Sequence, residues 1–174
     1  MKTKILILLA LVSLIVVTAF AQEKSKKQIK EEKKIEKQRQ VEAMINAREF
    51  VFTGRTAMPS GYKSVSLTTT TNYVKFHPEL IESYMPYYGR AYSGVGYGGD
   101  SGLKFEGKPE EYTFTKGKKN YQVNATVKGE RDTFSLSLTV SFEGSASLLI
   151  NSNNRSSISY SGEITLPEKQ DEKN

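Results

Sequence analysis

The sequence predicts an all-β fold, an antiparallel meander of eight or nine strands that closes into a barrel or a two-layer sandwich, preceded by a charged N-terminal helix. From residue 50 onward, short segments alternate between apolar and polar residues, as strands do when one face is buried. These segments recur at intervals of about ten residues with turn residues between them, a spacing typical of sandwiches and barrels. Residues 26–47 contain no Gly or Pro and are rich in Lys, Glu and Gln, which favour helix.

The first 21 residues have the layout of a secretory signal peptide. Lys2 and Lys4 precede an apolar run over 5–17, and Ala19 and Ala21 form a small-x-small cleavage pattern. The alternative is an uncleaved anchor, but the run is shorter than the ~20 residues that a membrane span needs. We therefore expect cleavage after Ala21, and an exported protein with no transmembrane segment once the leader is removed.

Composition excludes several classes of site. The 174-residue chain has no cysteine, one histidine and a formal net charge of +6. Disulfides, zinc–thiolate sites and cysteine nucleophiles are therefore impossible. Much of the net charge lies in residues 22–49, where Lys and Arg are interspersed with Glu. This pattern indicates a solvated helix, whereas a nucleic-acid reader gathers basic residues on one face of its fold. We expect no nucleic-acid partner, no metal and no cofactor.

The charged arm, residues 22–48, is expected to be helical from Lys26 to Ala47. Val41, Met44 and Ile45 share one helix face at 100° per residue. The apolar residues of the first half point elsewhere. We therefore expect only the last two or three turns to dock on the β domain.

The β domain is expected over 49–166, followed by a polar tail, 167–174. Its clearest strand runs from Phe134 to Phe142, where five apolar residues alternate with Ser and Thr. The last five strands are expected over 110–116, 119–128, 133–142, 146–151 and 157–165, with three or four more around Phe50, Val65 and Val74. The parity of the alternation predicts three cross-strand pairs, Phe114 with Tyr121, Val127 with Phe134, and, across a three-residue loop at 143–145, Leu138 with Ile150.

Two loops carry the candidate ligand-binding residues. Residues 84–102 hold five of the ten tyrosines and six of the thirteen glycines, a composition typical of binding loops; the alternative is a loop that covers one end of the barrel. The simplest interpretation of the polar stretch 151–156 is a hairpin loop. The alternative is that its arginine binds a carboxylate or phosphate. The candidates are Tyr87, Tyr88, Arg90, Tyr92, Tyr97, Asn153, Asn154 and Arg155.

Catalysis has little support in the sequence. His77 precedes Pro78 and has no obvious partner. The carboxylates of 100–111 could supply a pair for glycoside hydrolysis, but nothing fixes their separation. We expect no catalytic residue and no enzyme activity.

Three stretches, 87–92, 104–112 and 151–162, resemble domain-of-unknown-function family 4251. The most specific part is Asn-Ser-Asn-Asn-Arg at 151–155, and the resemblance covers about 35–165. It implies a periplasmic or secreted protein of a Gram-negative, Bacteroidetes-type envelope. It implies no activity, substrate or catalytic residue.

Three functions remain open. The first is a periplasmic binding module that holds an unknown small molecule at the Tyr/Gly-rich loop. The second is an envelope scaffold or interaction domain that docks an envelope protein through the helix or a sheet edge. The third, a hydrolase using loop carboxylates, is the weakest. An open or filled barrel interior is the observation that would separate the first two most directly.

Overall fold

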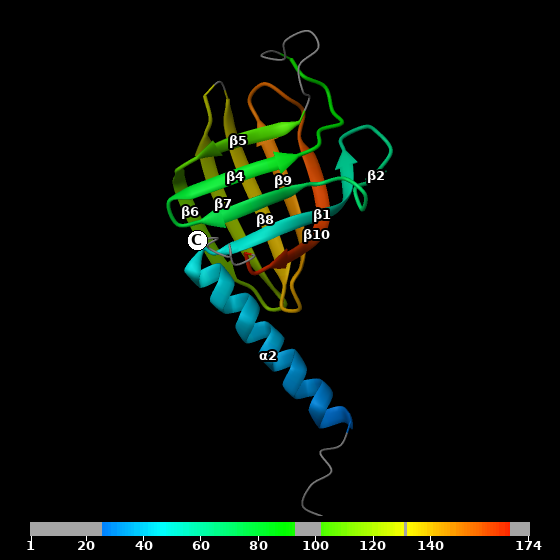
Figure 1. Cartoon of the computed structure of the whole chain (residues 1–174), viewed down its shortest axis with the longest axis vertical. Coiled ribbons are helices and arrows are strands. Elements are labelled where there is room, and N and C mark those ends of the chain that lie inside the picture. Colours follow the sequence, from blue (N-terminus) through cyan, green and yellow to red (C-terminus); the bar gives the residue numbers. More distant parts are fainter. Residues whose placement is uncertain (1–25, 93–101, 131, 168–174) are drawn as a thin grey trace, which may run out of the picture. The chain divides into compact units, whose positions relative to one another are not determined.

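A computed structural model describes residues 26–92, 102–130 and 132–167 (Figure 1). One helix and ten strands make up this part of the chain. Their bounds are α2 Lys26–Ala47, β1 Phe50–Pro59, β2 Val65–Ser66, β3 Tyr73–His77, β4 Leu80–Met85, β5 Leu103–Gly107, β6 Pro109–Lys116, β7 Asn120–Lys128, β8 Thr133–Ser141, β9 Ser145–Ser152 and β10 Ile158–Thr165. The helix in these ranges, α2, is not long and apolar enough to cross a membrane.

All ten strands belong to one antiparallel sheet in the order β5-β4-β3-β1-β10-β9-β8-β7-β6, with β2 paired to β1. The first strand, β1, pairs with the last, β10, from Val51–Thr165 to Pro59–Ile158. This pairing joins two layers, because β1, β3, β4 and β5 cross in front of β7, β8 and β9 (Figure 1). The result is a nearly closed barrel-like sheet. The all-β meander and the N-terminal helix are thus confirmed, and of the two expected architectures the structure has the barrel-like one.

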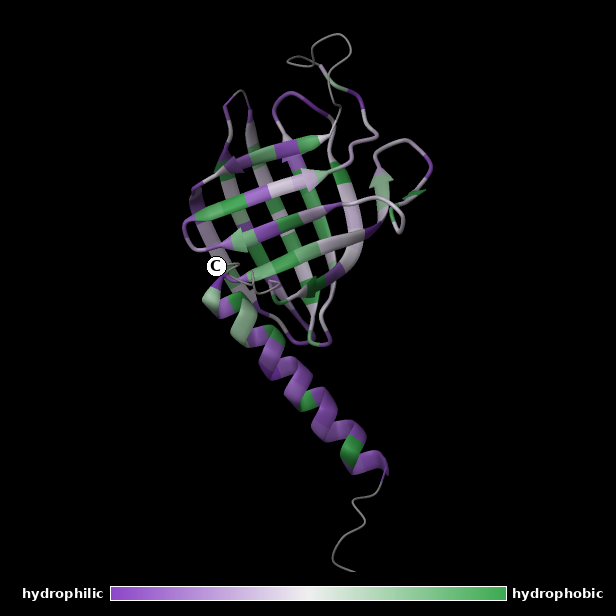
Figure 2. Cartoon of the chain, viewed as in Figure 1, coloured by the Kyte–Doolittle hydropathy of each residue, from purple (hydrophilic) through white to green (hydrophobic). Residues whose placement is uncertain are grey.

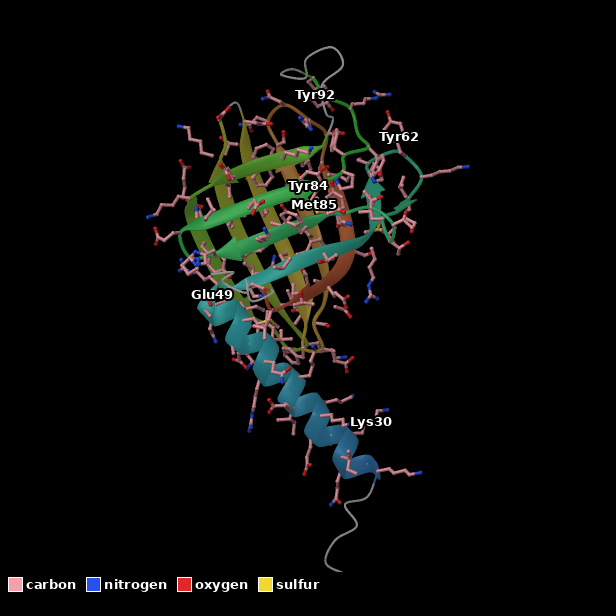
Figure 3. The ribbon with its side chains drawn as sticks, viewed as in Figure 1. Lys30, Glu49, Tyr62, Tyr84, Met85 and Tyr92 are labelled. Atoms are coloured by element: carbon pink, nitrogen blue, oxygen red, sulfur yellow. The ribbon has the colours of Figure 1, made fainter. Side chains whose placement is uncertain are left out.

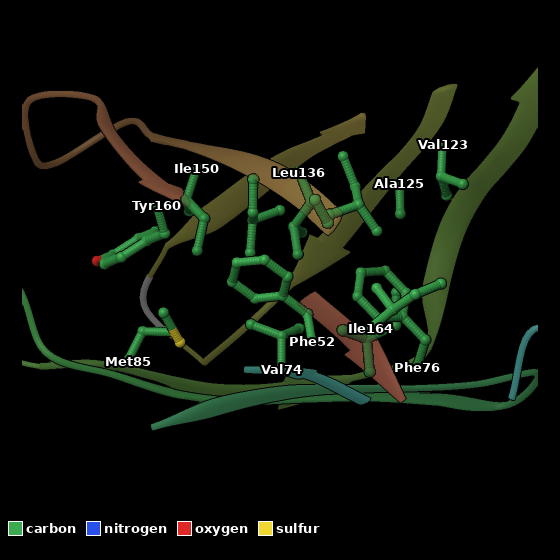
Figure 4. Close-up of a cluster of buried hydrophobic side chains, with 14 of the residues drawn as sticks. Phe52, Val74, Phe76, Met85, Val123, Ala125, Leu136, Ile150, Tyr160 and Ile164 are labelled. Atoms are coloured by element: carbon green, nitrogen blue, oxygen red, sulfur yellow. The ribbon is translucent and has the colours of Figure 1, made fainter. Parts of the chain in front are cut away.

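The barrel interior is packed with apolar side chains. One continuous cluster includes Phe50, Phe52, Leu138, Leu148 and Tyr160, each at most 1% exposed. Figure 4 shows residues of both layers, among them Phe52 and Leu136, packed against one another. In Figure 2 green residues recur along each strand between paler or purple ones, since alternate residues of a strand point to opposite faces.

The chain divides into two compact units, 1–35 and 36–174. The described residues of the first, 26–35, are helical and exposed. In the second, α2 buries Val41, Met44 and Ile45, so the predicted helix bounds and the docking of its last turns are confirmed. The helix ends in a left-handed residue, Arg48, with φ 58°. The backbone N–H groups of Arg48 and Glu49 bond to the carbonyls of Ile45 and Met44 (3.2 and 3.1 Å), which is the Schellman pattern of helix termination.

The register of the last five strands tests the predicted pairs. Val127 lies opposite Phe134, as predicted. The other two pairings are wrong by two positions, since Tyr121 faces Lys116 and Leu138 faces Leu148. The loop between β8 and β9 does have three residues, but they are 142–144, one earlier than expected. A left-handed residue is needed there, and Gly144, with φ 92°, occupies the last position of the loop. Parity is unchanged by the shift in β9, so Leu148 and Ile150 still point inward, whereas Phe114 on β6 is exposed.

A buried asparagine organises the bend in β1. The register between β1 and β10 slips between Gly54 and Thr56. There the Asn72 side chain, 5% exposed, accepts a hydrogen bond from the Gly54 N–H (2.7 Å) and donates to the carbonyls of Gly54 (3.1 Å) and Thr70 (2.9 Å). Asn72 thus replaces the ladder bonds that a bulge removes from a strand.

Candidate functional site

The sheet has one open seam. Its two end strands, β5 and β6, follow each other through Lys108 but do not pair in the described part of the chain. Strand β6 pairs with β7 as far as Val127, and there β5 comes close to β7. A Cβ on Gly107 would lie 2.9 Å from the Lys128 carbonyl oxygen. Farther along β5, a Cβ on Gly129 of the β7–β8 turn would lie 3.7 Å from the Phe105 Cβ.

A cavity of about 470 Å³ lies at this seam; we call it the seam cavity. One wall comes from β4 and β5 through Glu82, Ser83, Tyr84, Lys104, Phe105 and Glu106. The other comes from the β7–β8 turn, the start of β8 and the β9–β10 loop through Gly129, Glu130, Asp132, Phe134, Asn154 and Arg155. The volume is within the range of ligand pockets, ~300–1,000 Å³.

An aromatic pair joins the two walls. The rings of Phe105 and Phe134 are stacked, with centroids 3.9 Å apart and planes 9° from parallel. They are only 9% and 7% exposed and belong to the hydrophobic core. The apolar part of the seam cavity is therefore anchored to the packed interior, which favours a preformed site.

The outer face of the β4–β5 wall carries an ordered row of aromatic and charged side chains. Tyr73, Tyr84 and Lys104 are opposite one another on β3, β4 and β5. The tyrosine rings stack at 5.8 Å, and the Lys104 ammonium lies 4.3 Å from the Tyr84 ring centroid, a cation–π distance. Tyr84 is exposed (Figure 3). It offers the seam cavity an aromatic surface held in place by its neighbours.

Two of the carboxylates in the seam cavity are already engaged within the protein. Glu82 accepts hydrogen bonds from the Tyr73 hydroxyl (2.6 Å) and the Lys75 ammonium (3.0 Å). These bonds, led by the one from Tyr73, hold the pKa of Glu82 below its ordinary value against the opposing effect of burial. Asp132 accepts from its neighbour's N–H, from the Asn153 N–H (3.1 Å) and from the Ser152 hydroxyl. Asp132 thereby ties the β7–β8 turn to the β9–β10 loop.

The structure brings the two predicted ligand-binding segments together. A β-bridge joins Ala91 to Arg155, the Tyr92 N–H donates to the Asn154 carbonyl (2.8 Å), and the Ser156 N–H donates to the Arg90 carbonyl (2.9 Å). Asn154 and Arg155 line the seam cavity. Arg155 donates from Nη1 to the Gly102 carbonyl (2.8 Å). The seam cavity therefore uses the end of the second predicted loop and, from the first, only Tyr84, which was not among the candidate residues.

Tyr87 is buried and supports the loop from within. Its hydroxyl lies 2.7 Å from the Arg90 carbonyl oxygen and 3.0 Å from that of Ser156. The hydroxyl hydrogen of Tyr87 is therefore donated to the protein backbone. The Arg155 guanidinium lies 5.3 Å from the Tyr87 ring centroid. Tyr87 thus positions a residue of the seam cavity without lining it.

The other candidate residues lie outside the seam cavity. Tyr88 and Tyr92 are exposed, Tyr92 by 70%, and Arg90 donates from Nε to the exposed Tyr62 hydroxyl (3.2 Å). Tyr62 and Tyr92 are both labelled in Figure 3. Asn153 contributes its backbone N–H to Asp132. Tyr97 lies outside the described residues.

A comparison with family models matches residues 32–164 to a domain of unknown function, DUF4251. The chain belongs to the DUF4251 family. Among solved structures, a DUF4251 family protein from Bacteroides eggerthii DSM 20697 superposes with a TM-score of 0.59 at 19% identity, over 75% of this chain and 87% of that one. At this identity the likeness concerns the fold alone. No curated protein matches the chain.

Most of the seam cavity of this DUF4251 domain is not predicted by local sequence patterns. Lys104 and Phe105 enter the sequence prediction only through the family resemblance, Glu106 also as one of the carboxylates of 100–111, and Phe134 only as a core residue. What places them together is the approach of β5 to the β7–β8 turn, which no local sequence pattern encodes. In the described ranges no cluster of three or more His, Asp or Glu side chains is arranged to hold a metal ion.

Proposed function

We propose that this DUF4251 protein is an exported, non-catalytic binding module of the Gram-negative envelope, and that its ligand site is the seam cavity. The observation that carries the proposal is the cavity itself: about 470 Å³, with a stacked Phe105–Phe134 pair and a small set of polar groups around it. Ligand sites commonly combine an apolar lining with a few placed polar groups. Because the barrel interior is filled, we locate the ligand at the seam and not inside the barrel.

A binding role fits the chemistry of the lining better than catalysis does. Asp132 accepts three hydrogen bonds from its surroundings, and Glu82 accepts two. The partners of Glu82 hold the pKa of that carboxyl below its ordinary value. A general acid would need the opposite, a pKa raised toward neutrality. These two carboxylates therefore stabilise the walls of the site.

Export rests on the N-terminal pattern of Lys2, Lys4 and the Ala19-x-Ala21 motif. Expressed in a Gram-negative host, the protein is expected in the periplasmic or secreted fraction with Gln22 as its first residue. Intact-mass measurement of the fractionated protein tests this. A full-length chain in the cytoplasm would contradict it.

Binding at the seam cavity can be tested by NMR with soluble aromatic, sugar and amino-acid fragments. Fragments that bind should shift the amide signals of Lys104, Phe105 and Gly129. A Cβ on Gly129 would lie 3.2 Å from the Phe134 ring and 3.7 Å from the Phe105 Cβ, so Gly129→Leu should fill the cavity and abolish the shifts. Thr139→Leu, on the exposed face of β8, is the matched control and should leave them unchanged. Fragments that bind both variants equally would place the site elsewhere.

A further inference from the structure

We propose that Arg90, together with the exposed tyrosines Tyr62 and Tyr92, forms a second interaction surface, which binds an acidic segment of a partner protein through its carboxylates. We call these three residues the Tyr–Arg surface. None of them lines the seam cavity, so this inference goes beyond the proposed function and does not rest on it.

The backbone of Arg90 is fixed on both sides. Its N–H donates to the Ser156 hydroxyl oxygen (3.1 Å). Its carbonyl oxygen accepts from the Ser156 N–H (2.9 Å) and lies 2.7 Å from the hydroxyl of the buried Tyr87. A side chain that extends from such a fixed backbone has less conformational freedom to lose on binding, which favours affinity.

The guanidinium of Arg90 is held by Tyr62. Arg90 Nε donates to the Tyr62 hydroxyl oxygen (3.2 Å), and the tyrosine keeps its own hydrogen for another acceptor. Among the described residues Arg90 is in no ion pair. Its terminal amino groups therefore remain as donors, in the planar arrangement that suits a carboxylate.

Tyr92 adds an aromatic side chain on the same side of the loop. The residue between Arg90 and Tyr92, Ala91, forms the β-bridge with Arg155, and residues two apart in an extended chain point to the same face. Tyr92 is 70% exposed and Tyr62 is 53% exposed, and both lie at the same end of the barrel (Figure 3). Tyrosine and arginine are enriched among the residues that dominate binding in protein interfaces, which favours a protein as the partner.

The charge around the Tyr–Arg surface favours an acidic partner. Residues 50–78, 83–92 and 144–162, which the contacts of Arg90 and Ala91 bring together, contain no Asp or Glu. They do contain Lys63, the neighbour of Tyr62 in the sequence, which is exposed. An acidic segment would meet cations here with no opposing carboxylate from these stretches, and the attraction should weaken as salt is added.

The test uses capped peptides of about seven residues, titrated into the purified protein and followed by NMR. One alternates glutamate with leucine, and its neutral counterpart alternates glutamine with leucine. We expect the glutamate peptide to shift the amide signals of Tyr62, Arg90 and Tyr92, and to bind about fivefold more tightly than the glutamine peptide, as for a well-formed exposed ion pair. Equal binding of the two peptides would overturn the proposal.

Substitutions of Arg90 separate its geometry from its charge. Arg90→Gln should abolish the preference for the glutamate peptide, and Arg90→Lys should restore less than half of it, because an ammonium cannot reproduce the planar donors of a guanidinium. The matched control is Arg55→Gln, on an exposed arginine of β1 that is paired with Glu163 (2.8 Å). It makes the same change in net charge and should leave the preference unchanged.

Three outcomes decide between this proposal and its alternatives. A preference that survives Arg90→Gln, or that falls equally in Arg55→Gln, would show that no specific contact with Arg90 exists. Tighter binding of a short oligogalacturonate, which carries its carboxylates on sugar rings, would replace the protein segment with an acidic glycan. Gly129→Leu, designed to fill the seam cavity, should leave peptide binding intact, so the failure of one proposal can be told from the failure of the other.

Discussion

At the scale of single residues, Asn72 stands out because its buried side chain hydrogen-bonds to the backbone of β1. It is one of two buried polar residues in the described ranges, the other being Ser83. Its amide satisfies both backbone groups of Gly54 at the point where β1 leaves register with β10. On the other side of that point Gly162 allows a very close approach, since a Cβ there would overlap the Thr53 carbonyl. The bend in β1 therefore depends on an asparagine and a glycine that no alternation pattern marks.

Asn72→Ala should lower the free energy of unfolding by about 2–4 kcal/mol, because it leaves the buried N–H and C=O of Gly54 without partners at ~1–3 kcal/mol each. Urea denaturation followed by circular dichroism measures the change. The control is Asn124→Ala on the exposed face of β7, which should cost less than about 1 kcal/mol. Equal losses in the two variants would show that the Asn72 bonds add nothing specific.

At the scale of elements, the contact between α2 and the barrel includes a charged hydrogen-bonding group on Glu42 of the helix. Glu42 accepts hydrogen bonds from the Lys116 ammonium, 2.9 Å from each carboxylate oxygen, and from the Tyr121 hydroxyl (3.0 Å). Nearby, the Tyr112 hydroxyl lies 3.3 Å from the Ile45 carbonyl oxygen, and burial raises the pKa of Tyr112 to about 12. Polar contacts of α2 with β6 and β7 thus surround the apolar contact of Val41, Met44 and Ile45.

The hydrogen bonds from Lys116 and Tyr121 hold the pKa of Glu42 below its ordinary value. A carboxylate with a lowered folded-state pKa stabilises the fold fully above its unfolded pKa, ~4.3, and loses that contribution as the pH falls through the folded pKa. Glu42→Gln should therefore be less stable than the parent at pH 7, and the two should converge as the pH falls through the lowered folded-state pKa of Glu42. Thermal unfolding across this range measures the difference, which 1 M salt should reduce. A gap that is the same at pH 3 and pH 7 would rule out the ionic contribution.

The element scale also shows why some strands could be predicted and others not. In β8 every inward residue from Phe134 to Val140 is apolar, so alternation alone predicts it. In β4 the inward sequence is Ile81, Ser83, Met85, and the serine breaks the pattern. Ser83 is tolerated there because its hydroxyl donates to the Leu103 carbonyl (2.9 Å), a partner on another strand. Strand β5 has only two large inward residues, too few to stand out beside a glycine-rich segment.

At the scale of the whole molecule, the seam cavity depends on contacts that are distant in sequence. Its walls come from 82–84, 104–106, 129–134 and 154–155, and only their place in the sheet order makes them neighbours. Composition led to the tyrosines of 84–102 because clustering is visible in a sequence. Of the described tyrosines, Tyr84 lines the seam cavity, Tyr87 braces the loop from within, and Tyr92 lies exposed.

The pairing of β1 with β10 bears on how the chain reaches its folded state. The hairpins from β6 to β10 close over short loops and can form early, and β1 can pair with the nearby β2 and β3. Its other partner, β10, lies about a hundred residues away, the kind of distant contact that slows folding. During synthesis β1 emerges first and has no completed sheet to join until Thr165 has left the ribosome. The barrel-like sheet can therefore close only after the whole β domain has left the ribosome.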